Sequence, residues 1–175
     1  MKDLKPSKPY MLKRWRINLP TGCYYFFTCA RPGRTGSPES KHAPIADEVV
    51  HRWVLGLPGP KTAIVSLLGY KPDGLSEFSF YSFSSCLDNS TKESLSFQEW
   101  LNKYHKNLTV VVREHPTCDF SQIDLDKRDV VAADIKELLL EGRTVVVVDS
   151  GGQTRTNQIC KHIHAIEDSS HMHQA

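Results

Sequence analysis

The sequence lacks several features that would place it in a membrane or an oxidising compartment. It has no apolar run of about 18 residues, the length a membrane-spanning helix needs. Its first nine residues carry positive charge but no apolar stretch typical of a signal peptide. Its five cysteines are odd in number and never spaced as C-x-x-C, which favours free thiols. We therefore expect a cytoplasmic protein that makes no membrane contact.

Charge of one sign is not in excess either. The formal net charge is +2 and the pI is near 8.3, so a polyanion such as nucleic acid is not the expected partner. No Walker lysine motif is present. The histidine pairs His162/His164 and His171/His173 are interpreted as solvated side chains rather than metal ligands. We therefore expect neither a metal nor another cofactor, and no feature indicates an oligomeric state.

Hydrophobic periodicity predicts alternating strands and helices in a single domain. The expected strands cover residues 23–29, 62–68, 77–83, 108–113 and 145–148. The expected helices cover residues 45–57, 97–104, 126–141 and 157–163, with Ser96 as the N-cap of the second. This alternation is typical of an α/β fold with a central, mostly parallel sheet flanked by helices. We expect an extended basic arm over residues 1–20, a domain over 21–166 and a flexible tail over 167–175.

Residues 144–156 combine a strand, a small-residue loop and a helix start. Four consecutive valines indicate a strand buried on both faces. The loop after it is rich in glycine and ends at Arg155. Convergent N–H groups, a helix N-terminus and an arginine together form a site for a phosphate-like oxyanion. The residues expected to bind phosphate are Ser150, Gly151, Gly152, Gln153, Thr154 and Arg155.

This loop resembles the signature of the dual-specificity (tyrosine/serine/threonine) phosphatases, H-C-x-x-G-x-x-R-[S/T], within the cysteine-dependent protein phosphatase superfamily. Gly152, Arg155 and Thr156 match it position by position. Upstream, the segment 115–120 is similar to the family's general-acid loop, in which Asp119 would be the acid. The resemblance covers residues 23–165, with an insertion over about 69–107.

The resemblance implies a phosphatase-like fold and a catalytic set consisting of the nucleophile position, Asp119, Arg155 and Thr156. In the family a cysteine thiolate attacks the phosphorus and the arginine clamps two phosphate oxygens. The acid protonates the leaving oxygen, and the hydroxyl beside the arginine assists release of the thiolate. The implied ligand is a phosphorylated protein or a small phosphoester.

Two departures from the signature remove the expected chemistry. Asp149 stands at the nucleophile position, and Val148 replaces the preceding histidine. A carboxylate repels the incoming phosphate, and the loop N–H groups can bind this carboxylate instead, with Arg155 as its counter-ion. Phosphoryl transfer to an aspartate uses Mg²⁺ and commonly a second aspartate two residues on, where this chain has Gly151. We therefore expect a pseudophosphatase that binds a phosphorylated or acidic partner.

Other interpretations stay open at this point. The parent protein is an active phosphatase if Asp149 was engineered in place of its cysteine. The loop is a plain turn if it binds nothing, and Asp119 is then a loop or capping residue. The second cysteine-to-arginine motif, Cys29 to Arg34, is one residue short and contains Pro32, so we interpret it as a surface loop whose arginines add charge at the site mouth.

Overall fold

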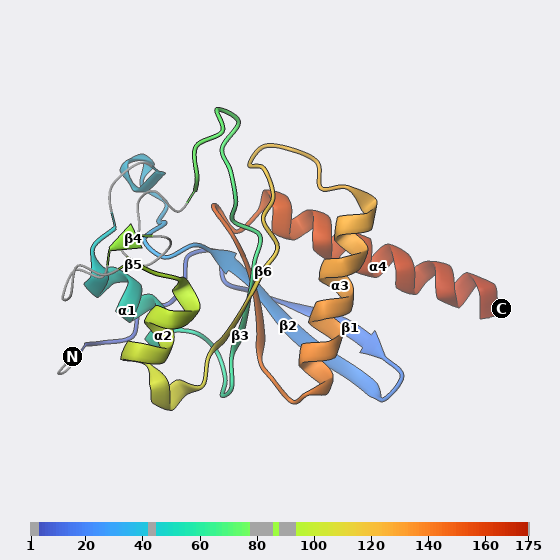
Figure 1. Cartoon of the computed structure of the whole chain (residues 1–175). Coiled ribbons are helices and arrows are strands. Elements are labelled where there is room, and N and C mark those ends of the chain that lie inside the picture. The colour runs from blue at the N-terminus through green and yellow to red at the C-terminus, as the bar shows by residue number, and fades with distance from the viewer. Residues whose placement is uncertain (1–3, 42–44, 78–85, 88–93, 175) are drawn as a thin grey trace.

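The computed structural model describes residues 4–41, 45–77, 86–87 and 94–174, and these contain a five-stranded mixed sheet with helices on both faces (Figure 1). The strand order is β1-β2-β7-β3-β6. β1 is antiparallel to β2, and the other neighbours are parallel. The expected α/β class with a mostly parallel sheet is confirmed. The strands are β1 (Lys13–Leu19), β2 (Gly22–Ala30), β3 (Ala63–Ser66), β6 (Val111–Glu114) and β7 (Val145–Asp149).

Four α-helices lie in the described part of the chain, and none of them is long and apolar enough to cross a membrane. They are α1 (Asp47–Leu55), α2 (Phe97–Tyr104), α3 (Leu125–Leu140) and α4 (Thr154–Gln174). Two 3₁₀ turns, η1 (Pro38–Lys41) and η2 (Lys106–Leu108), and a small ladder of β4 (Cys86–Leu87) with β5 (Ser94–Leu95) complete the described elements. The strand expected at 77–83 lies outside the described residues, apart from Glu77.

The valine run in β7 builds both halves of the core. Val145 and Val147 face the cluster formed by α3 and α4, whereas Val146 and Val148 face the cluster formed by α1 and α2. Side chains of a strand alternate between faces, so a central strand covered on both sides is apolar at every position. All four valines are buried. The continuous run is therefore explained by the central place of β7 in the sheet.

The first described residues join the domain. Lys13–Leu19 form β1 at the edge of the sheet, within the segment expected to be an arm. Before β1, the Ser7 N–H donates to the Arg52 carbonyl, and the Tyr10 carbonyl accepts the N–H of Ala30. A Cβ at Gly56 would lie 1.9 Å from the Ser7 carbonyl oxygen. This end of the chain therefore packs against the C-terminus of α1.

Helix α2 lies in the expected insertion and closes one edge of the sheet. Its predicted N-cap is confirmed: the Ser96 side chain accepts from the Glu99 N–H, and the Glu99 side chain accepts from the Ser96 N–H. The Gln98 side chain donates to the Val110 carbonyl and accepts from the Val112 N–H, so it satisfies the exposed edge of β6.

At the other end of the chain, the backbone of residues 167–174 continues helix α4, in the segment that the sequence analysis expected to be a flexible tail.

A buried histidine pair connects α1 to the end of α2. The Nδ1 atom of His51 lies 2.8 Å from Nε2 of His105, and the His51 ring stacks on Trp100. Burial, and secondarily the charge of His51, lowers the pKa of His105 from 6.5 to about 4. His105 is therefore neutral in the folded protein at neutral pH.

This pair predicts that acid weakens the fold over a defined window. Between about pH 6.5 and pH 4 the unfolded chain protonates His105 while the folded chain does not, so the free energy of unfolding falls as the pH is lowered. One proton contributes a slope that approaches about 1.4 kcal/mol per pH unit. Urea unfolding at several pH values gives the free energy of unfolding as a function of pH. Between pH 6.5 and pH 4 this free energy should fall less steeply with falling pH in His105→Gln than in the wild type. Equal slopes would contradict the prediction.

Candidate functional site

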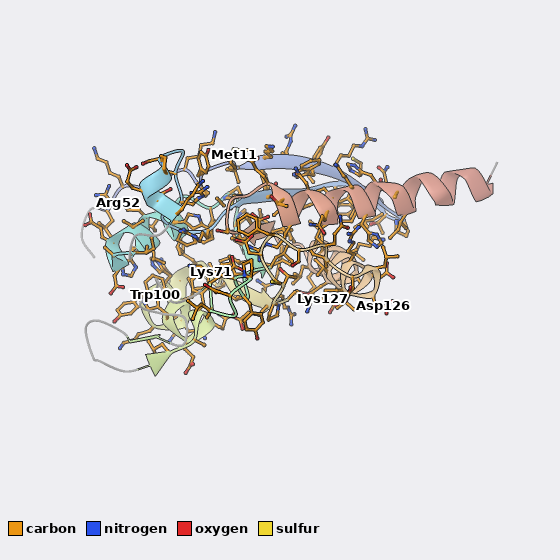
Figure 2. The ribbon with its side chains drawn as sticks, turned by 90° about the horizontal axis from the view of Figure 1, so that it is seen from above. Met11, Arg52, Lys71, Trp100, Asp126 and Lys127 are labelled. Carbon is orange, nitrogen blue, oxygen red and sulfur yellow. The ribbon has the colours of Figure 1, made fainter. Side chains whose placement is uncertain are left out.

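A cavity of about 490 Å³ opens at the carboxyl ends of the parallel strands. Ligands of open α/β sheets bind at this edge, because the loops after successive strands converge there. Figure 2 looks onto this edge from above and labels Lys71 near the middle of the view. The lining residues come from five segments of the chain: Tyr10, Arg31, Arg34, Lys41, Lys71, Pro72, Asp73, Glu77, Asp119, Phe120, Ser150, Gly151, Gln153 and Thr154.

The loop after β7 has the shape that its sequence predicts. Ser150, Gly151, Gln153 and Thr154 line the cavity, and α4 begins at Thr154. Gly152 has a φ of +73°, and a Cβ there would lie 2.6 Å from the Ala30 nitrogen. Only glycine fits this position, because the left-handed backbone and the close approach to β2 both exclude a side chain. The signature glycine is therefore required by packing as well as by the turn.

The Asp149 side chain is bound by the backbone N–H groups of this loop and of the start of α4. One carboxylate oxygen accepts the N–H groups of Arg155 and Thr156, both at 2.9 Å, and the other accepts the N–H of Gly152. Asp149 is buried at the N-terminus of α4, where the helix dipole also favours a negative charge. The expectation that the loop N–H groups bind this carboxylate is confirmed, and the carboxylate is bound as an internal anion.

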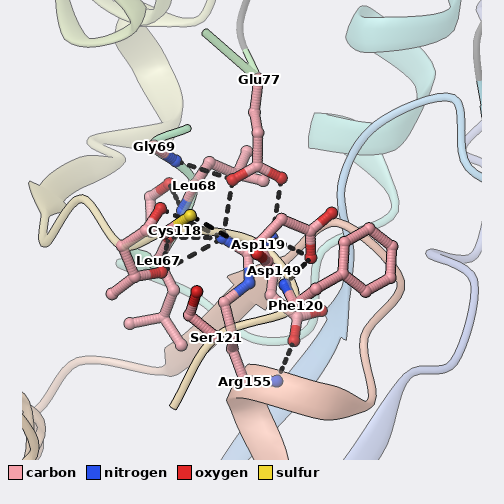
Figure 3. A network of polar contacts seen from close by, with 12 residues as sticks. Leu67, Leu68, Gly69, Glu77, Cys118, Asp119, Phe120, Ser121, Asp149 and Arg155 are labelled. Atoms are coloured by element: carbon pink, nitrogen blue, oxygen red, sulfur yellow. Dashed lines mark hydrogen bonds and ion pairs between the residues drawn. The ribbon is translucent and has the colours of Figure 1, made fainter. Parts of the chain in front are cut away.

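The Arg155 guanidinium does not serve as the direct counter-ion of Asp149, which corrects the sequence-based interpretation. Its two terminal nitrogens donate to the two Glu77 oxygens at 2.6 and 2.7 Å (Figure 3). It also donates to the Leu67 carbonyl and to the Thr117 side chain. Arg155 is buried and does not line the cavity. Burial alone would lower its pKa, but the hydrogen bonds to Glu77 and the negative charges of Glu77, Asp119 and the more distant Asp149 raise the pKa above its usual value.

Asp119, the candidate acid, lies at the same site. Its Oδ1 atom is 3.3 Å from Nη2 of Arg155 and also accepts the Phe120 N–H at 3.0 Å. Thr156, the hydroxyl expected to act on the nucleophile, is fully buried next to Arg155. Its hydroxyl oxygen has no hydrogen-bond partner among the described residues. The structure thus brings all four members of the expected catalytic set to one place.

Cations from the loop after β2 line the cavity, as the sequence indicated. The Arg31 side chain donates to the carbonyls of Pro32, Ser40 and Lys41 and so holds the loop in place. Arg34 and Lys41 line the cavity beside it. Cys29, which precedes this loop, is buried, and burial followed by the charge of Asp149 raises the pKa of its thiol far above the usual range. This cysteine is therefore an inert thiol rather than a second nucleophile.

Sequence reasoning missed several residues of the site, among them Tyr10, Lys41, Lys71 and Glu77. Lys41 and Lys71 belong to loops whose path the local pattern does not fix, and Tyr10 belongs to the expected arm. Glu77 had one usable signal, a lone carboxylate beside an aromatic-rich stretch. Its partner, however, is 78 positions away in the sequence.

Comparisons with protein-family models, with curated proteins and with solved structures gave no match.

The buried pair of Glu77 and Arg155 predicts a large loss of stability on neutralising Glu77. Both side chains are nearly inaccessible, and removing one partner of such a pair leaves a buried charge, at a typical cost of about 3 kcal/mol. We expect Glu77→Gln to lower the free energy of unfolding by about that amount in urea titrations.

Glu48→Gln is the matched control. Glu48 pairs with Arg52 at a similar distance of 2.8 Å, but both side chains are exposed on α1. Such a surface pair contributes about 0.5 kcal/mol. If the two variants lose the same stability, Glu77 does not compensate a buried charge.

Proposed function

We propose that this chain is a dual-specificity phosphatase-like domain without phosphatase activity, which binds a phosphorylated or acidic partner at the mouth of its cavity. Three features support the resemblance: the strand, loop and helix around Gly152, the buried arginine that follows, and an aspartate from the loop after β6 beside it. The fold class and the location of the cavity agree with this assignment.

The observation that carries the proposal is the Asp149 carboxylate bound to the N–H groups of Gly152, Arg155 and Thr156. A substrate phosphate needs such N–H groups, and the carboxylate repels it by about 4 kcal/mol per unit of phosphate charge at 4 Å in a partly screened site. A charge-assisted hydrogen bond contributes about 1.5–3 kcal/mol, so the repulsion exceeds what a remaining donor restores. In addition, Arg155 is already bound by two carboxylates.

The mouth of the cavity retains positive charge that this internal pairing does not consume. Arg34 and Lys41 line it, and the Arg34 guanidinium donates to the neutral Ser40 hydroxyl. Of the three acidic residues that line the cavity, Glu77 and Asp119 are paired with Arg155, and Asp73 accepts the Leu75 N–H. An anionic group therefore finds attraction at the mouth and repulsion at the floor.

A second candidate, an active phosphomonoesterase in which Asp149 replaces a catalytic cysteine, is favoured by one specific observation. The buried Thr156 hydroxyl has no hydrogen-bond partner among the described residues. A buried hydroxyl without a partner is costly and calls for an explanation. In the family this hydroxyl serves the cysteine sulfur, which is the group that Asp149 replaces.

Activity measurements separate the two candidates. The wild-type protein is expected to release no p-nitrophenol from p-nitrophenyl phosphate, because it has no thiolate nucleophile. Asp149→Cys is expected to gain measurable turnover, and adding Asp119→Asn should slow that turnover by about 10²-fold through loss of the general acid. Wild-type turnover that persists in Asp149→Ala would contradict the proposal. A folded but inactive Asp149→Cys would eliminate the second candidate.

Binding at the mouth is tested by titrating the wild-type protein with phenyl phosphate and following amide chemical shifts. We expect the chemical-shift changes to be confined to the cavity-lining loops. The affinity for phenyl phosphate should fall about fivefold to tenfold in Arg34→Ala or Lys41→Ala, because each variant removes one charge near the anion. Lys61→Ala is the control, since Lys61 precedes β3 at the opposite edge of the sheet. Equal weakening by all three variants would indicate unspecific attraction and would count against the proposal.

A further inference from the structure

Three large apolar side chains are exposed beside the cavity. Tyr70 and Leu75 belong to the hairpin of residues 70–76 and are 53% and 60% exposed, and Phe120 in the loop after β6 is 81% exposed. The backbone joins these two segments: the Tyr70 N–H donates to the Thr117 carbonyl, and the Asp119 N–H donates to the Tyr70 carbonyl. In Figure 1 the two segments rise together above the sheet. The pairing of Tyr70 with Ser76 and of Lys71 with Leu75 puts Leu75 on the same face of the hairpin as the cavity-lining Lys71, and Tyr70 on the opposite face. Leu75 and the cavity-lining Phe120 are called here the hairpin surface.

Phe120 is held in an unfavourable backbone conformation. Its φ is +59°, a left-handed value that typically costs a residue with a bulky side chain about 1–2 kcal/mol. Its ring is mostly exposed, so burial does not offset this cost. The Phe120 N–H donates to Asp119, which is paired with Arg155, so the ion-pair network of the site fixes the strained residue. Strain of this kind is found where a side chain is presented to a ligand.

The charge next to the hairpin surface is mainly positive. Lys71 is part of the hairpin, and Arg34 and Lys41 line the same cavity. Asp73, the one acidic residue within the hairpin segment, accepts the Leu75 N–H and thereby stabilises the turn. An apolar surface bordered by cations is complementary to a segment that combines apolar and acidic side chains.

We propose that the hairpin surface docks an extended segment of a partner protein that carries an acidic or phosphorylated residue flanked by aliphatic or aromatic residues. The inference rests on the proposed function, because the anionic residue lies at the cavity mouth near Arg34 and Lys41. The flanking residues pack on Leu75 and Phe120. The hairpin thus determines which partners are accepted, and the cations at the mouth bind the charge.

The test uses synthetic libraries of ten-residue peptides whose central residue is phosphoserine, glutamate or serine and whose other positions vary. The immobilised full-length protein is expected to enrich phosphoserine or glutamate peptides with apolar flanking residues. The double variant Leu75→Ser/Phe120→Asn should bind individual enriched peptides about tenfold more weakly, measured by fluorescence anisotropy. Tyr70→Ser, on the opposite face of the hairpin, should leave this affinity unchanged. Phe120→Asn alone should also weaken the binding of these peptides, because it removes the aromatic ring. Asparagine tolerates the left-handed backbone, so the loop conformation is retained.

Leu140→Ser is the matched control, since Leu140 is 54% exposed at the end of α3 and lies outside the hairpin surface. Urea unfolding verifies that every variant is folded. Enrichment without any preference for apolar flanks, or affinity unchanged in the double variant, would overturn the docking inference. If the docking inference fails in this way but the protein still binds phenyl phosphate, the proposed function is retained. If phenyl phosphate binding is absent as well, the proposed function and the docking inference are both contradicted. Self-association in sedimentation that depends on Leu75 and Phe120 would instead identify a second copy of this chain as the occupant, and would overturn the inference too.

Discussion

The buried charge of Arg155 is the constraint on which the rest of the site depends. A guanidinium that is almost fully inaccessible requires opposite charge and hydrogen-bond acceptors in fixed positions. Glu77, Asp119 and the carbonyl of Leu67 provide them from three different segments. The arginine therefore ties the start of α4 to the hairpin, to the loop after β6 and to the end of β3. The shape of the cavity follows from these attachments.

Asp149 adds a second, internal neutralisation at the same place. A carboxylate at a helix N-terminus satisfies donors that the helix leaves unpaired, and the dipole of α4 favours its charge. The same arrangement stabilises this loop and opposes the entry of a phosphate. Under the proposed function, stability and catalysis thus make opposite demands on position 149. The chain satisfies the first, and its remaining positive charge lies at the cavity mouth.

The local elements could be predicted because their causes are local. The valine run specifies a strand covered on both faces, and Ser96 with Glu99 specifies the start of α2. Gly152 marks a left-handed turn that any side chain would disturb. The assignment of Arg155 as the partner of Asp149 was wrong for a related reason. Residues six positions apart in sequence were assumed to pair, whereas the guanidinium turns toward the ends of β3 and β6.

By itself, the sequence determined the alternation of strands and helices, the loop after β7 and the absence of a thiol at position 149. Only the tertiary structure decided that Glu77 covers Arg155, that Tyr10 and Lys41 reach the cavity, and that the hairpin of residues 70–76 lies beside Phe120. Periodicity and capping act over a few residues, so they leave a trace in the sequence. The pairing of Glu77 with Arg155 joins positions 78 residues apart. Such a contact arises from the crossover connections of a parallel sheet, and no local pattern encodes it.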